Sequence, residues 1–192
     1  MPPKTAKIPS VTIGPISPIN KDWKDWKNLL KALKLEALLS APVKWLQNYD
    51  EALKQAAEMT GSAGSADLGA HVVMAYFAGS DWCSHCIDLD NEVFQSKTFR
   101  QWFNFGRMVP LLLDFPNSKS QSAEIKTQNA QLYTQYAIGG FPSVLAIRAT
   151  AVCLSTGTCV VNASEIARVV GYSKGSGPDA WIKSFSDATG IQ

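Results

Sequence analysis

Two cysteines, Cys83 and Cys86, stand two residues apart where an apolar run gives way to a helical pattern, and this spacing constrains the chain more than any other feature. The apolar run, residues 71–77, predicts a buried strand that ends at the Gly-Ser-Asp stretch 79–81. Cys83 is therefore expected at a helix N-terminus, where free backbone N–H groups and the helix dipole favour the thiolate. Such a pair exchanges between dithiol and disulfide, and its thiolate attacks other disulfides.

Other uses of paired cysteines fit this sequence less well. Covalent haem attachment requires a histidine directly after the second cysteine, and that position holds Ile87. A structural zinc site needs four ligands, typically with a second ligand pair at short spacing. The remaining cysteines, Cys153 and Cys159, are separated by five residues, and His71 is the only histidine outside the motif, so zinc is weakly supported.

His85 lies between the two cysteines of the motif. Its imidazole is expected to stabilise the Cys83 thiolate, and hence the reduced form of the pair. The pair is then a stronger oxidant than one with proline at this position. The alternative is that His85 is an exposed residue of the first helical turn with no effect on the cysteines.

Two stretches of the chain resemble the thioredoxin superfamily. Residues 77–86, FAGSDWCSHC, resemble the active-site stretch of bacterial extracytoplasmic thioredoxin-like disulfide isomerases and reductases. Residues 140–142, Gly-Phe-Pro, resemble the segment that carries a cis-proline facing the redox pair throughout the superfamily. The resemblance implies that Pro142 is cis, that the Phe141 backbone pairs with substrate polypeptide, and that Trp82 belongs to the same substrate-binding surface.

The chain departs from thioredoxins proper in one respect that concerns the mechanism. Thioredoxins carry a buried acid on the active-site strand, which helps to move the proton of the resolving cysteine. The matching stretch here, Met74-Ala75-Tyr76, contains no acid. The nearest carboxylate in sequence, Asp81, is expected to cap or solvate its loop, which leaves proton transfer to water or to another side chain.

The order of apolar patterns predicts an α/β sandwich, and it fits the thioredoxin fold that the resemblance implies over residues 43–192, with a central mixed sheet flanked by helices. Strands are expected at 43–46, 71–77, 109–113, 144–147 and 167–170. The 109–113 run is expected to be buried on both faces of the sheet. Inward-facing helical residues are expected at Leu53, Ala56 and Ala57 after an Asp50 cap, at Ile87, Val93 and Phe94, at Phe99, Trp102 and Phe103 after a Ser96 cap, at Ile125, Leu132 and Tyr136, and at Trp181, Ile182 and Phe185 after Pro178.

Residues 1–42 differ in composition from the rest and are expected to form an N-terminal helical extension. They hold seven lysines and three acids, whereas the remainder holds eleven basic and thirteen acidic residues. A proline-rich start leads into a basic amphipathic helix at about 21–39. We expect its apolar side, which includes Trp23 and Trp26, to pack on the domain; the alternatives are a membrane surface or a partner protein. Nucleic acid is not an expected partner, since a few lysines without an aromatic or glycine-rich binding pattern are weak evidence for nucleic-acid binding.

The cysteines outside the motif bear on the compartment. Residues 155–157, Ser-Thr-Gly, predict a tight turn that brings Cys153 and Cys159 together as a structural disulfide. A second redox pair and two unpaired thiols are the alternatives. Such bridges persist in oxidising compartments, which favours a periplasmic or other extracytoplasmic location. The start of the chain, Met1-Pro2-Pro3-Lys4, is not followed by the apolar stretch of a signal peptide, so the chain is expected to be a mature domain without its leader or, alternatively, cytoplasmic.

The sequence therefore predicts a thiol–disulfide oxidoreductase that acts on cysteines or disulfides of other proteins and exchanges electrons with a further redox partner. Cys83 is expected to be the attacking thiolate and Cys86 the resolving thiol, and His85 is expected to tune the stability of the Cys83 thiolate. No cofactor is required for this chemistry. The competing hypothesis is a thioredoxin-like module in which Cys83, His85 and Cys86 hold a soft metal, copper or zinc, for delivery.

Overall fold

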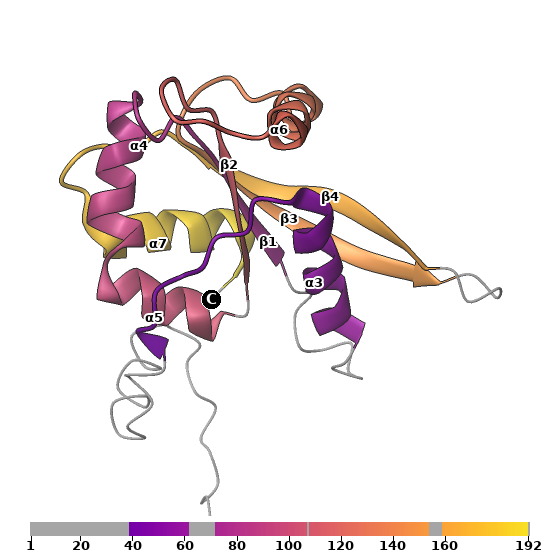
Figure 1. Ribbon diagram of the computed structural model, residues 1–192. Helices are drawn as coiled ribbons and strands as arrows, with labels where there is room; N and C mark the ends of the chain where they lie inside the picture. The colour runs from indigo at the N-terminus through magenta and orange to yellow at the C-terminus, as the bar shows by residue number, and fades with distance from the viewer. Residues whose placement is uncertain (1–38, 62–71, 107, 154–158, 192) are drawn as a thin grey trace, which may run out of the picture.

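The computed structural model describes residues 39–61, 72–106, 108–153 and 159–191, with backbone alone at 60–61, 153 and 159 (Figure 1). The predicted N-terminal extension therefore lies outside the described residues, apart from its last four positions. The elements are α3 (Tyr49–Gly61), β1 (Val72–Ala78), α4 (Ser84–Leu89), the π-helical η1 (Asp90–Phe94), α5 (Lys97–Phe105), β2 (Val109–Asp114), α6 (Ala123–Gln135), β3 (Ser143–Cys153), β4 (Cys159–Val170) and α7 (Gly177–Thr189).

Four strands form one mixed sheet in the order β2-β1-β3-β4. β1 pairs in parallel with β2 and antiparallel with β3, and β3 pairs antiparallel with β4. All seven residues of β1 are buried, as expected for a central strand covered on both faces. The expected mixed sheet flanked by helices is therefore confirmed.

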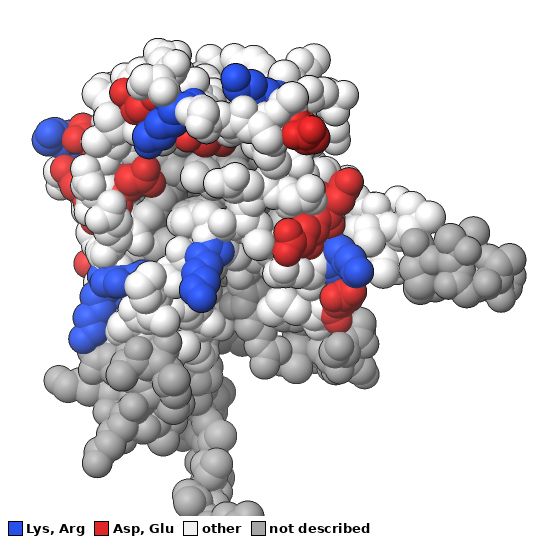
Figure 2. All heavy atoms as spheres, viewed as in Figure 1, with Lys and Arg blue, Asp and Glu red and all other residues white. Residues whose placement is uncertain are grey.

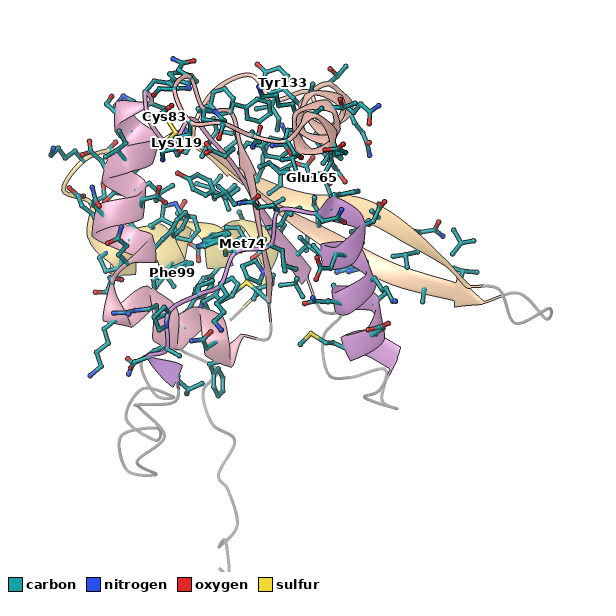
Figure 3. All side chains as sticks on the ribbon, viewed as in Figure 1. Met74, Cys83, Phe99, Lys119, Tyr133 and Glu165 are labelled. Carbon is teal, nitrogen blue, oxygen red and sulfur yellow. A yellow bond between two sulfur atoms is a disulfide. The ribbon has the colours of Figure 1, made fainter. Side chains whose placement is uncertain are left out.

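Helices cover both faces of the sheet, and the alternation of β1 divides the core into two layers. Val73, Ala75 and Phe77 pack with α3 and α6. Met74 and Tyr76 pack on the opposite face with α4, η1, α5 and α7, where Phe99 is fully buried. Figure 3 shows Met74 and Phe99 in this second layer.

The helix signals in the sequence are largely confirmed. Ser96 caps α5, accepting a hydrogen bond from the Phe99 N–H at 3.0 Å, and Pro178 lies in the first turn of α7. The buried residues of α3, α5 and α7 include all those expected to face inward: Leu53, Ala56, Ala57, Phe99, Trp102, Phe103, Trp181, Ile182 and Phe185. The prediction that Asp50 caps α3 is wrong, because Asp50 lies within the helix. The side chain that caps the first turn is that of Asn48, which accepts a hydrogen bond from the Glu51 N–H at 2.8 Å.

The expected first strand, residues 43–46, is reduced to one bridge. Leu46 pairs in parallel with Leu111, donating to the Pro110 carbonyl at 2.9 Å and accepting from the Leu112 N–H at 2.8 Å. The next bond of this ladder would run from residue 110 to the carbonyl of Lys44. Proline has no N–H to donate, so the ladder stops there.

β2 also differs from the expectation that it is buried on both faces. Its residues alternate between buried and half-buried, with Leu111 and Leu113 in the core and Leu112 partly exposed. The strand lies at one end of the four-stranded sheet, and Leu112 lines a surface hollow on one of its faces.

β3 and β4 are far longer than the sequence pattern indicated, 11 and 12 residues. Their outer halves extend from the domain as a two-stranded arm (Figure 1). Val152 and Val160, which pair across the arm, are 46% and 53% exposed, so these residues lack the inward–outward alternation that identifies a strand. Cys153 and Cys159 are directly opposite each other in the backbone register, and their side chains lie outside the description.

Among the described residues, no helix combines the length and apolar character needed to cross a bilayer. On the face shown in Figure 2, acidic and basic side chains are scattered among uncharged ones, without a large area of a single sign.

Candidate active site

Cys83 and Cys86 are joined in a disulfide at the start of α4, with their Cα atoms 5.2 Å apart. Cys83 has extended backbone and is the N-cap residue: its sulfur accepts from the Cys86 N–H at 3.2 Å. Cys83 is 7% exposed and Cys86 is fully buried. This is the asymmetry that the helix start predicts, with the first sulfur nearer to solvent and the second one turn into the core.

Polar contacts tie the loop before Cys83 to the segment that follows β2. The carboxylate of Asp81 accepts from the backbone N–H groups of Asn117, Ser118 and Lys119, at 2.9, 2.7 and 3.3 Å. These hydrogen bonds hold the pKa of Asp81 well below its ordinary value. Asp81 therefore binds the segment that follows β2, whereas the sequence pattern predicted that it caps or solvates its own loop.

Ser80 makes a second set of contacts to the same segment. Its N–H and hydroxyl donate to Asp114 at 2.9 and 2.6 Å, and the Lys119 ammonium donates to the Ser80 hydroxyl at 2.9 Å. Because the carboxyl ends of the parallel strands β1 and β2 lie at the same edge of the sheet, the residues that follow them meet there. Figure 3 labels Cys83 and Lys119, which follow these two strands.

Trp82 links the motif to the segment before β3. Its indole N–H donates to the Phe115 carbonyl at 2.7 Å, and its ring meets that of Phe141 edge-on at a centroid distance of 5.6 Å. The Phe141–Pro142 peptide bond is cis, which confirms the isomer implied by the thioredoxin resemblance. Trp82 is nevertheless 46% exposed, so one side of the indole remains available at the surface.

An aromatic groove of about 630 Å³ lies beside Trp82. The rings of Trp82, Phe115, Tyr133 and Phe141 contribute to its wall, and Lys126 is the charged side chain in its lining. Phe141 contacts the other three rings, stacking on Tyr133 at 5.9 Å and tilting against Phe115 at 5.3 Å. The α6 side of the groove, where Tyr133 lies, is visible in Figure 3.

His85 and Ile87 are both exposed on α4, on either side of the buried Cys86. The expectation that Ile87 faces inward is wrong. Successive side chains on a helix point about 100° apart. Cys86, Leu89 and Val93 lie on the buried face of the helix, so Ile87 points toward solvent. Ile87 and Trp82, which flank the motif in sequence, are therefore both large apolar side chains exposed to solvent.

On the inner side of α4, the fully buried Tyr76 and the half-buried Asp90 lie close to Cys86. The Tyr76 hydroxyl donates to the Cys86 carbonyl at 3.2 Å. Burial, and secondly the charge of Asp114, raise the pKa of the Asp90 carboxyl to about 6, against smaller opposing effects of Lys119 and of a hydrogen bond from Tyr76.

Two contacts join residues expected at the site: the Cys83–Cys86 disulfide, and the ring contact of Trp82 with Phe141, the residue before cis-Pro142. The expected structural pair, Cys153 and Cys159, lies on the arm, which extends away from α4 (Figure 1). Sequence reasoning missed Asp90 and the aromatic partners Phe115 and Tyr133. Asp90 carried a usable signal, since it lies one helical turn after Cys86; the two aromatic residues carried none, because only the fold brings them to Trp82.

The alternative in which this site holds a metal gains no support from the geometry. Within the described ranges, no group of three or more histidine, cysteine, aspartate or glutamate side chains is arranged to hold a metal ion.

Comparison with known proteins identifies one relative in sequence and one in structure. No family model matches the chain. Over 77 residues the chain is 34% identical to the disulfide bond reductase DsbH of Chlamydia pneumoniae, a stretch that covers 40% of this chain and slightly less than half, 46%, of DsbH. A solved structure of a DsbH oxidoreductase aligns over 81% of this chain and 90% of its own, with a TM-score of 0.61 and 24% sequence identity. The chain therefore has the thioredoxin-like fold, and it is homologous to DsbH.

Proposed function

We propose that this protein is a thiol–disulfide oxidoreductase that acts on protein cysteines through the Cys83/Cys86 couple. The observation that carries the proposal is the disulfide at the start of α4, in which Cys83 is slightly exposed and Cys86 is fully buried, together with the cis-proline that follows Phe141, a residue in contact with Trp82. The sequence match to a protein named as a disulfide bond reductase points to the same chemistry.

In the reducing direction, the Cys83 thiolate attacks a substrate disulfide and forms a mixed disulfide, releasing one substrate sulfur as thiolate. Cys86 then loses its proton and attacks the Cys83 sulfur. The Cys83–substrate bond breaks, the second substrate sulfur leaves as thiolate, and the Cys83–Cys86 disulfide remains. Two electrons have passed to the substrate, and a separate redox partner must return them.

His85 is proposed as the residue that tunes this couple. It is exposed on the first turn of α4, adjacent in sequence to the buried Cys86 and two residues from Cys83. From this turn an imidazole is able to approach the Cys83 sulfur and favour the thiolate.

The proposed substrate-binding surface consists of Trp82, Phe141 and Pro142. The backbone at Phe141 is proposed to pair with an extended substrate segment, while the exposed part of Trp82 and the aromatic groove receive an apolar side chain close to the substrate cysteine. Scattered charges on the face in Figure 2 are consistent with recognition by main-chain and apolar contacts.

We propose an extracytoplasmic location, in which the reduced couple meets disulfide-bonded proteins. The support is the opposed placement of Cys153 and Cys159 in the register of the arm, which suits a structural disulfide that persists only in an oxidising compartment.

The test is turnover and trapping by cysteine variants of the full chain. Wild type is expected to accelerate the reduction of insulin by dithiothreitol, whereas Cys83→Ser falls to the rate of dithiothreitol alone. Cys86→Ser is expected to accumulate dithiothreitol-sensitive mixed disulfides, because attack occurs without resolution.

The double variant Cys83→Ser/Cys86→Ser is the control and should trap nothing. If adducts form equally well in this control, or if Cys83→Ser turns over as wild type does, the couple is not the active site.

A further inference from the structure

Resolution of the mixed disulfide requires a base, because Cys86 must lose its proton before it attacks Cys83. Cys86 is fully buried, and a buried thiol ionises less readily than an exposed one. The strand beneath it supplies no carboxylate: the three residues 74–76 are Met, Ala and Tyr. The base must come from elsewhere in the fold.

Asp90 lies one helical turn after Cys86, and its backbone N–H donates to the Cys86 carbonyl. Side chains four residues apart on a helix are neighbours, with Cβ atoms about 5–6 Å apart. A π-turn starts at this residue, where the Asp90 carbonyl accepts from the Gln95 N–H at 2.9 Å. Such turns interrupt a regular helix and are often found at functional sites.

Tyr76 connects the two residues from the sheet side. Its hydroxyl donates to the Cys86 carbonyl at 3.2 Å and is near enough to the Asp90 carboxyl to lower the pKa of that group slightly. Burial raises the pKa of Tyr76, so its hydroxyl keeps its proton and does not itself serve as the base.

A hollow of about 610 Å³ gives Asp90 a route to solvent. Its lining includes Asp90, Tyr76, Gln95, Arg100 and Leu112. A carboxyl that lies one helical turn from Cys86 and also lines such a hollow is able to take a proton from the interior and exchange it with water.

Burial is the main reason that the pKa of Asp90 is raised, and the charges around the carboxyl adjust the pKa further. Asp114 on β2 disfavours the carboxylate, Lys119 after β2 favours it, and Arg100 on α5 lines the same hollow. The resulting pKa of about 6 suits a group that is mostly ionised at pH 7 and still readily accepts a proton.

The other carboxylates near the motif have different partners. Asp81 accepts three backbone N–H bonds, which keep it ionised. Asp114 accepts from Ser80, Asp88 pairs with Lys174 at 3.1 Å on the surface, and Glu92 accepts from Tyr172 and Gly175.

We propose that the Asp90 carboxylate, directly or through one water molecule, accepts the Cys86 proton during resolution. The inference rests on the proposed function. The S–H proton moves to Asp90, the Cys86 thiolate forms a bond to the Cys83 sulfur, and the Cys83–substrate bond breaks to release a thiolate. Asp90 then passes the proton to water in the hollow. When the couple is reduced, the same carboxyl returns a proton to Cys86.

Stopped-flow reaction with Ellman's reagent isolates this step without a physiological substrate. In full-length protein carrying Cys153→Ser/Cys159→Ser, the reduced Cys83 attacks the reagent and releases one coloured thiolate. Cys86 then displaces the second, so the slow phase reports resolution. Its rate in the parent protein is expected to rise with pH through a midpoint near 6, the pKa of Asp90.

Asp90→Asn is expected to slow the second phase by about 100-fold at pH 7 and to abolish the midpoint, leaving the first phase unchanged. Asp90→Glu should restore part of the rate and a midpoint. Asp88→Asn, which removes a carboxylate from the same helix at the surface, is the matched control and should behave as the parent. Melting of Asp90→Asn at or above the parent temperature at pH 7 establishes that it is folded, since burial disfavours the charged carboxylate.

An unchanged second phase in Asp90→Asn overturns the proposal, because the carboxylate then has no role in resolution. A faster second phase overturns it as well, because the charge then only repels the Cys86 thiolate. Equal slowing in Asp88→Asn overturns it as well. The two proposals fail separately: if insulin is not reduced while the two phases behave as described, the function is wrong and the role of Asp90 stands.

Discussion

At the residue scale, the site depends on a close approach between Gly79 and Trp82. A Cβ atom built on Gly79 would lie 2.4 Å from the Cε2 atom of the Trp82 indole, a distance that real Cβ atoms do not reach. The absence of a side chain at position 79 lets the indole lie back across the loop, where it donates to the Phe115 carbonyl and contacts Phe141. A single small residue therefore sets one wall of the aromatic groove.

Gly79→Ala is expected to leave the protein folded and to turn the half-exposed indole outward, because a ring at the surface has room to move. The hydrogen bond to Phe115 and the contact with Phe141 are then lost. We expect the KM for insulin to rise several-fold, with the rate of reaction with Ellman's reagent unchanged. The fluorescence of Trp82, obtained by difference from Trp82→Phe, should shift to the red.

Gly139→Ala is the matched control, since a Cβ there meets no atom within 4 Å. Equal effects of the two alanine substitutions, or no change in Trp82 fluorescence in Gly79→Ala, would contradict the account of this groove.

At the element scale, the sequence predicted best those elements that face the core on a regular period. The stripes of α3, α5 and α7 repeat with the helical period, and β1 is a continuous apolar run, so each was recognised. The outer halves of β3 and β4 were missed because cross-strand hydrogen bonds hold them together without a core behind them. The prediction of a strand at 43–46 was wrong for a different, local reason: Pro110 has no N–H to continue the ladder of hydrogen bonds.

The arm formed by β3 and β4 is expected to carry a disulfide that stabilises it without taking part in catalysis. Replacing both Cys153 and Cys159 by serine should lower the free energy of unfolding by about 2 kcal/mol, because a bridge that closes so short a loop removes little entropy from the unfolded chain. Denaturant unfolding measures this loss. Insulin reduction should stay close to wild type, because the arm extends away from α4 (Figure 1).

A folded double variant that no longer reduces insulin would instead make these cysteines a second redox centre. That result would contradict the proposal of a single active site.

At the scale of the whole molecule, the site is assembled from segments far apart in the sequence. The Cys-x-x-Cys spacing and the Gly-Phe-Pro segment predicted the disulfide and the cis-proline, because each is a local pattern. The contacts of Phe141 with Phe115 and Tyr133, and the burial and charges that set the pKa of Asp90, depend on how the strands and helices pack. No single stretch of sequence encodes them.

The most direct test of the central claim is the reduction potential of the Cys83/Cys86 couple. Protein equilibrated with glutathione at defined ratios is quenched and alkylated, and mass spectrometry reports the oxidised fraction of these two cysteines. A catalytic couple is expected to show one two-electron transition between about −270 and −120 mV, the range spanned by thioredoxin-fold oxidoreductases. A pair that stays oxidised below about −300 mV would behave as a structural disulfide and would contradict the proposed function.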